Sequence, residues 1–219
     1  MSHSFLDLKH KQREIRSDLP ERLGLRVHRC LSWLNRAEQA LGDNDASFIF
    51  FWISFNAAYA EEIGESSTHG ERSAFEEYFY KLIELDRGNR IYNAIWLEFP
   101  QSIRVFLNNK YIFQPFWKYH NQIEGYVDWQ DRFDASKRRF NLALANQDTK
   151  TILTMLFDRL YVLRNQLVHG GATWNSSVNR DQVQDGTRIL AFLVPIFVEL
   201  MMDNPKTDWG TPYYPVVNN

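Results

Sequence analysis

A run of large apolar side chains constrains the fold more than any other feature of this chain. Between Ala46 and Ile63, every face of an expected helix carries aromatic or aliphatic residues. These residues are Phe48, Ile49, Phe50, Phe51, Trp52, Ile53 and Phe55. The segment is too short to span a bilayer comfortably. We therefore expect a helix that is either central in the fold or buried in a subunit interface.

Three other segments repeat apolar residues at spacings of three, four and seven, the pattern of one helix face. They are residues 18–41, 148–169 and 179–202. Short helices are expected near 73–86, 91–97 and 101–109, followed by an aromatic and irregular stretch. No convincing alternating strand pattern is present. The sequence therefore predicts an all-α fold.

Local signals indicate where these helices begin and end. Asp18-Leu19-Pro20-Glu21 has the composition of a capping box at a helix start. Gly170 follows His169 and suits the left-handed residue that ends many helices. Pro195 should kink the last long helix.

The same pattern suggests a domain division. Residues 1–17 are polar and charged, and we expect a loose arm or a frayed helix. Residues 18–203 are interpreted as a single helical domain with an insertion at about 64–146. Residues 204–219 are rich in Pro and Asn and are expected to form a coil tail.

Bulk properties exclude several classes of protein. The net charge is −2, so a global basic field for nucleic acid is absent. The single Cys30 excludes an intramolecular disulfide and suits a reducing cytoplasm. Met1 to Leu8 contains no apolar signal region, so we expect a cytoplasmic protein without membrane attachment. The histidines are scattered and no Gly-rich phosphate loop is present, so no metal or cofactor is expected.

The end of the 148–169 helix carries the residues best suited to chemistry. Arg164 remains charged, and its planar fork matches two phosphate oxygens. His169 has a pKa range suited to proton transfer. Asn165 can hydrogen-bond a phosphate or orient the histidine. Five residues on an ideal helix leave Arg164 and His169 about 140° apart, so they converge only if the helix unwinds before His169.

The run Arg164-Asn165-Gln166-Leu167-Val168-His169 resembles the R-x4-H signature of the HEPN superfamily (higher eukaryotes and prokaryotes nucleotide-binding domains). The Phe51-Trp52-Ile53-Ser54-Phe55-Asn56-Ala57-Ala58-Tyr59 run also looks like the second helix of bacterial HEPN proteins. The resemblance covers 18–63 and 147–203. It implies a four-helix bundle that dimerises, with two motifs facing one cleft and metal-independent RNA cleavage. Arg164 and His169 match the signature positions, and Asn165 matches their common polar neighbour.

One departure from the family concerns regulation. HEPN toxins that a partner antitoxin adenylylates carry a Tyr two residues after the His, whereas Gly171 stands there in this chain. This argues against that subtype. An antitoxin or another regulatory partner is still compatible with the resemblance.

Other residues are candidates for substrate binding. Asn56 is polar within an apolar run and is equally well explained as a buried amide bonded to backbone. Lys137, Arg138 and Arg139 form the best local basic patch, in a segment whose aromatics suit either base stacking or core packing.

We interpret the chain as a HEPN-like bundle with an inserted helical and aromatic segment, acting as a metal-independent endoribonuclease in bacterial defence or stress. The expected partners are RNA or a nucleotide and a second copy of the chain. One alternative is a non-catalytic HEPN module that binds a nucleotide, RNA or a protein. Another is a structural role, in which Arg164 pairs with Asp158 or an acid of the last helix and His169 caps its own helix.

Overall fold

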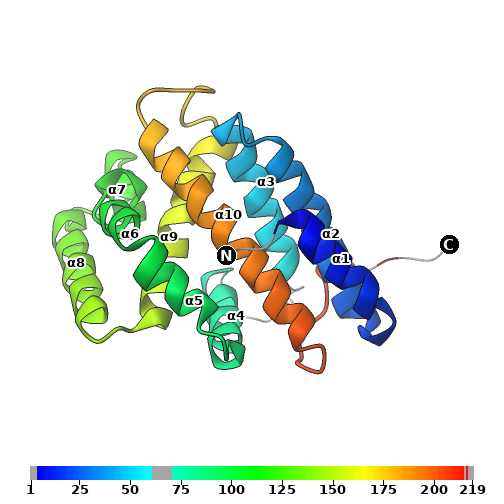
Figure 1. Cartoon of the computed structure of the whole chain (residues 1–219). Coiled ribbons are helices and arrows are strands. Elements are labelled where there is room, and N and C mark those ends of the chain that lie inside the picture. Colours follow the sequence, from blue (N-terminus) through cyan, green and yellow to red (C-terminus); the bar gives the residue numbers. More distant parts are fainter. Residues whose placement is uncertain (1–3, 61–70, 215, 217–219) are drawn as a thin grey trace. The chain divides into compact units, whose positions relative to one another are not determined.

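The computed structural model describes residues 4–60, 71–214 and 216, and every regular element among them is a helix (Figure 1). The all-α prediction is confirmed. The α-helices are α1 (Phe5–Ile15), α2 (Glu21–Gln39), α3 (Asn44–Tyr59), α4 (Glu71–Leu85), α5 (Arg90–Asn93), α6 (Pro100–Leu107), α7 (Gln114–His120), α8 (Trp129–Ala145), α9 (Thr149–Val168) and α10 (Arg180–Asp203). Short 3-10 turns form η1 (Arg16–Asp18) and η3 (Lys110–Ile112), and η2 (Ala94–Glu98) is a π-helix.

The chain divides into two compact units. The first unit contains Met1–Arg90 and Thr187–Asn219, and the second unit contains Ile91–Gly186. Helix α10 therefore begins in the second unit and continues in the first. The predicted insertion at about 64–146 stays a prediction.

Helices α2 and α3 lie side by side in the first unit (Figure 1). The Asp43 carboxylate starts α3 by accepting the N–H groups of Asp45 and Ala46, both at 3.1 Å. Two serines of this apolar helix bond to α2: Ser47 Oγ donates to the Ala37 carbonyl at 3.0 Å and Ser54 Oγ donates to the Cys30 carbonyl at 2.8 Å. Because small hydroxyls can bond backbone without a partner side chain, α3 packs closely on α2.

An aromatic cluster surrounds Phe55 of α3, which is fully buried. Its ring centroid lies 4.5 Å from that of Tyr59, 5.9 Å from that of Phe79 and 6.2 Å from that of Phe197. These rings come from α3, α4 and α10 of the first unit. The expectation of a central apolar helix is therefore met at Phe55. Offset and edge contacts between such rings contribute about 1 kcal/mol of stability per pair beyond the burial of the rings.

A buried arginine closes the C-terminal end of α3. Arg26 of α2 is 1% exposed, and its guanidinium donates to the carbonyls of Ala58 at 3.0 Å and Ala60 at 2.9 Å. It also donates to the Thr211 carbonyl at 3.0 Å, which attaches the C-terminal tail. The guanidinium thus satisfies carbonyls that the helix leaves unpaired and opposes the negative end of its dipole.

The N-terminal segment is a helix and not a loose arm. Ser4 and Asp7 form a capping box at the start of α1, in which Asp7 Oδ2 accepts the Ser4 N–H at 2.9 Å. Leu8 is fully buried. The capping box predicted at Asp18 is wrong, because Asp18 ends η1 and the N-cap of α2 is Pro20, whose ring offers no side-chain cap.

The second unit also differs from the sequence-based expectation. The stretch predicted as irregular contains α8, a helix of 17 residues. Only Phe140 and Ala143 of α8 are buried, with Phe133 and Ser136 half-buried at helical spacing. This narrow apolar stripe is easily hidden among the polar residues around it. The Asp148 side chain starts α9 by accepting the Thr151 N–H at 3.0 Å.

Replacement of Arg26 tests its role at the end of α3. We expect Arg26→Leu to lower the free energy of unfolding by about 3 kcal/mol, since buried carbonyls lose their donors. The measurement is urea unfolding followed by circular dichroism. Arg29→Leu is the matched control on the same helix and should change stability by less than about 0.5 kcal/mol. Equal losses in both variants would contradict the assignment.

The buried thiol supplies a second test. Burial raises the pKa of Cys30 from 9.0 to about 12, and its side chain is fully buried. We expect no reaction with a thiol reagent at about pH 8 in the folded protein and complete reaction in urea. Because the folded pKa is raised, this contribution to stability is present below pH 9.0 and is lost as the pH rises toward 12. In Cys30→Ala, the free energy of unfolding should fall less steeply as the pH rises above 9.0. An unchanged dependence on pH would count against a contribution from the Cys30 thiol.

Candidate functional site

Two glycines end α9 and place His169 at its tip. The Gly171 N–H donates to the Gln166 carbonyl at 2.7 Å, and the Gly170 N–H donates to the Leu167 carbonyl at 3.3 Å. Gly170 has a φ of 67°, as the left-handed position of this Schellman motif requires. A Cβ on Gly171 would lie 3.1 Å from the Gln166 carbonyl oxygen. The prediction that Gly170 is the left-handed residue ending this helix is confirmed. The geometry at Gly170 and the close approach at Gly171 explain why glycine occupies both positions.

Arg164 and His169 do not converge within one chain. Helix α9 continues to Val168, and the His169 N–H still donates to the Asn165 carbonyl at 3.0 Å. The condition for convergence, unwinding of the helix before His169, is therefore not met, because the Schellman motif ends the helix after this residue. The two side chains leave α9 about 140° apart.

Arg164 is held by its neighbours on α9. One guanidinium nitrogen donates to Asn165 Oδ1 at 2.8 Å, and the guanidinium carbon lies 5.7 Å from the centroid of the Tyr161 ring. Within the described chain, Arg164 does not pair with Asp158. Asn165 therefore orients the arginine, and Arg164 is half-buried.

His169 is exposed and lines a cavity of about 720 Å³ in the second unit. Among the described residues, its imidazole forms no hydrogen bond, so it does not cap the helix through its side chain. The cavity is lined by Tyr111, Ile112, Trp117, Asn121, Val162, Asn165, Gln166, His169, Gly171, Ala172, Ser176, Val178, Asn179 and Gln182. Asn165 and His169 share this lining, whereas Arg164 is not part of it.

We call this cavity the α9 cavity. Two side chains fix one of its walls. Gln166 Nε2 donates to the Tyr111 carbonyl at 2.6 Å, and Trp117 Nε1 donates to the same carbonyl at 2.7 Å. The bonds join η3 and α7 to the end of α9. Tyr111 and Trp117 are 52% and 38% exposed, which leaves part of their surface available to a ligand.

One lining residue of the α9 cavity, Asn179, carries an unsatisfied acceptor. Asn179 Oδ1 is buried and has no hydrogen-bond partner in the described structure. A buried oxygen without a donor costs about 1–3 kcal/mol. A ligand N–H that reaches this oxygen would recover that free energy.

The other predicted binding residues lie elsewhere. Lys137, Arg138 and Arg139 are on α8, and none of them lines the α9 cavity. Lys137 is paired with Asp134 at 2.9 Å, and this contact lowers the pKa of the Asp134 carboxyl. Asn56 is on α3 of the first unit, and its Oδ1 is buried without a partner in the described chain.

Sequence reasoning missed Tyr111 and Asn179 as cavity residues, and it named Trp117 only within the aromatic segment suited to base stacking or core packing. Tyr111 and Trp117 are far from Gln166 in the chain, so only the fold brings them together. Asn179 lies at the predicted start of the last helix, where its sequence context is that of an ordinary polar residue.

Comparison with models of known families, with curated proteins and with solved structures gives no match. Among the described residues, no helix combines the length and apolar character needed to cross a membrane. The described side chains also form no cluster of three or more His, Cys, Asp or Glu suited to a metal ion.

Proposed function

We propose that this protein binds a nucleotide or single-stranded RNA in the α9 cavity. The observation that carries the proposal is the combination of two accessible aromatic rings with an unsatisfied amide oxygen in one cavity. A base offers a flat π face to Tyr111 or Trp117 and edge N–H donors to Asn179. The resemblance of 164–169 to the HEPN signature supports the same class of ligand.

The composition of the lining favours recognition of the base over recognition of the phosphate. Among the lining residues that the structure describes, none is Lys, Arg, Asp or Glu. Their hydrogen-bonding groups are mainly amides, which can match both donors and acceptors on a base edge. The cavity volume of about 720 Å³ is in the range of small-ligand sites.

Metal-independent RNA cleavage is the second candidate, and the position of His169 favours it. Its imidazole lines the cavity and has no internal bond in the described structure, so it is available for proton transfer. Arg164 leaves the helix on another side and can bind a phosphate while Asn165 holds it. One chain therefore supplies one histidine, His169, to the α9 cavity, and its Arg164 lies outside that cavity.

A symmetric homodimer would complete such a site. Attack by the 2′-OH needs one group to accept its proton and another to protonate the leaving 5′-oxygen. Two copies of His169 can take these roles, and two copies of Arg164 can stabilise the phosphate. The products would be a 2′,3′-cyclic phosphate and a 5′-hydroxyl. A role in bacterial defence or stress belongs to this second candidate.

Binding is tested with a fluorescent single-stranded RNA of mixed sequence, measured by anisotropy. We expect Trp117→Ala to weaken binding about tenfold, since stacking of one base contributes about 1–3 kcal/mol. Asn179→Ala should weaken it through loss of the buried acceptor. Tyr119→Ala is the matched control, because Tyr119 is on the same helix with 41% exposure and is outside the lining. Binding that is insensitive to Trp117 and Asn179 would refute the proposal.

Cleavage is tested in EDTA with RNA and DNA of the same sequence. We expect RNA cutting alone, because the mechanism uses the 2′-OH and no metal. His169→Ala should abolish it with a small change in melting temperature, since this exposed helix-end residue contributes about 1 kcal/mol or less. Arg164→Lys should be strongly impaired, because an ammonium cannot make the bidentate contact.

The same assay tests the shared site. If both chains contribute, excess His169→Ala protein should reduce wild-type activity faster than the wild-type fraction falls. A linear fall would show that each chain acts alone. RNA binding without cutting would leave the first candidate and remove the second.

A further inference from the structure

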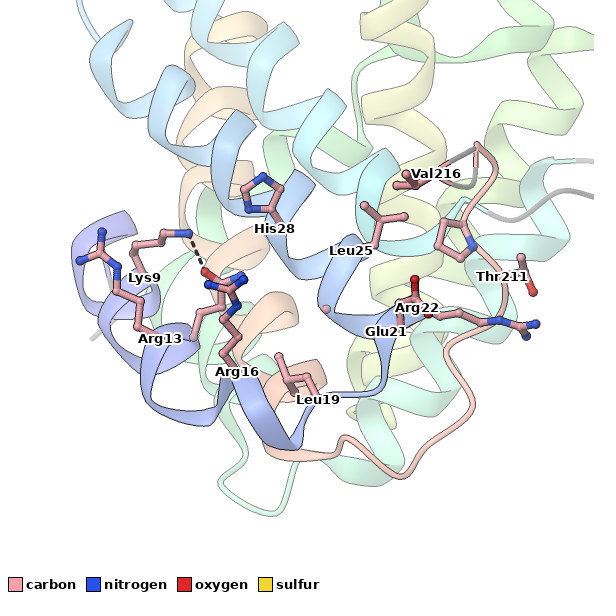
Figure 2. A pocket seen from close by; sticks show the side chains of 13 residues that line it. Lys9, Arg13, Arg16, Leu19, Glu21, Arg22, Leu25, His28, Thr211 and Val216 are labelled. Atoms are coloured by element: carbon pink, nitrogen blue, oxygen red, sulfur yellow. Dashed lines mark hydrogen bonds between the residues drawn. The ribbon is translucent and has the colours of Figure 1, made fainter. Parts of the chain in front are cut away.

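A second cavity of about 800 Å³ lies in the first unit, between α1, the start of α2 and the C-terminal tail (Figure 2). No part of the proposed RNA site contributes to it. Its size falls in the range of small-ligand sites, which is roughly 300 to 1,000 Å³.

Positive charge gathers on one side of this cavity. Lys9, Arg13 and Arg16 follow one another at spacings of four and three, so they share one face of α1 and η1. Figure 2 shows their side chains together on one side of the opening. Arg22 of α2 also lines the cavity, on the side of Thr211 (Figure 2), and Glu21 is the single carboxylate among the described lining residues. This local excess contrasts with the net charge of −2 for the chain.

The cations have no anionic partner in the described structure. Arg13, Arg16 and Arg22 form no hydrogen bond or ion pair with the described residues, and Lys9 Nζ donates only to Gln12 Oε1 at 2.6 Å. Burial lowers the pKa of Lys9, and the charges of Arg13 and Arg16 lower it further. Like charges at these spacings repel one another. An anion in the cavity would remove this repulsion.

The opposite side of the cavity includes an apolar wall and is held in place by the fold. Leu25 and Pro212 line it, and Figure 2 shows Leu25 and Thr211 across the opening from Lys9 and Arg13. The tail is fixed there because Arg26 donates to the Thr211 carbonyl at 3.0 Å. The cavity thus offers cations to one end of a ligand and apolar surface to the other.

We propose that this cavity binds a small organic polyphosphate, a molecule with two or more linked phosphates and an apolar or aromatic group. Several cations along one helix face match several linked phosphates better than a single anion. The apolar wall accounts for the organic part. The enclosed volume fits a small ligand better than a polymer backbone.

The test measures binding of pyrophosphate, ATP and adenosine by isothermal titration calorimetry. We expect pyrophosphate and ATP to bind, ATP more tightly, and adenosine not to bind at this site. Arg13→Gln and Arg16→Gln should each weaken binding about tenfold, because each removes charge-assisted hydrogen bonds to phosphate. Both side chains are exposed, so the variants should keep the circular dichroism spectrum of the wild type.

Two controls locate the site. Arg87→Gln removes an exposed cation of the first unit outside the cavity and should leave binding unchanged. Trp117→Ala, in the α9 cavity, should leave pyrophosphate binding unchanged, because pyrophosphate has no base to stack there. Equal binding by the Arg13 and Arg16 variants would overturn the proposal, as would loss of pyrophosphate binding in Trp117→Ala. If RNA bound through Arg13 and Arg16 while pyrophosphate did not, the ligand would be a nucleic acid and the proposal would be wrong.

Discussion

Arg26 places a fixed positive charge inside the first unit, at the point where α3 ends and the C-terminal tail returns. Its guanidinium bonds the carbonyls of Ala58, Ala60 and Thr211 at 2.9–3.0 Å. A buried charge is costly unless its hydrogen bonds are satisfied, and here carbonyl dipoles supply the negative partners. The same side chain therefore caps the C-terminal end of α3 and holds the tail that lines the cavity between α1 and α2.

The apolar surface of α3 explains why this arrangement is needed. A helix with no polar face must be covered along its length, and α2 covers one side through Ser47 and Ser54 while the Phe55 cluster fills another. Phe50 is covered only in part, by the Trp33 ring at 5.8 Å and the Arg36 guanidinium at 4.8 Å. The end of such a helix lies in the interior, where water cannot satisfy its carbonyls. A buried arginine is one of the few side chains that reaches several of them.

The sequence predicts the long helices well because their signals are local. Apolar periodicity locates α2, α9 and α10, and the left-handed Gly170 ends α9 where its neighbours indicate. Helix α8 was missed because its buried stripe is narrow. The cavities could not be predicted at all, since Tyr111 meets Gln166, and Arg26 meets Thr211, only after folding. Arg164 and His169 are separated because α9 is continuous to Val168, and ideal helix geometry then sets the directions of their side chains.

The binding that we propose for the two cavities would differ in its physical origin. The α9 cavity has stacking surfaces and amides but no lysine or arginine among its described lining residues, so affinity there must come from base contacts and little from counterion release. Phosphate recognition at that site therefore needs a cation from outside the lining. Arg164 adjoins the lining residue Asn165, yet it leaves α9 about 140° from His169. Cleavage by Arg164 and His169 together would thus require the arginine of a second chain or a rearranged α9 terminus, whereas binding of a base would require neither.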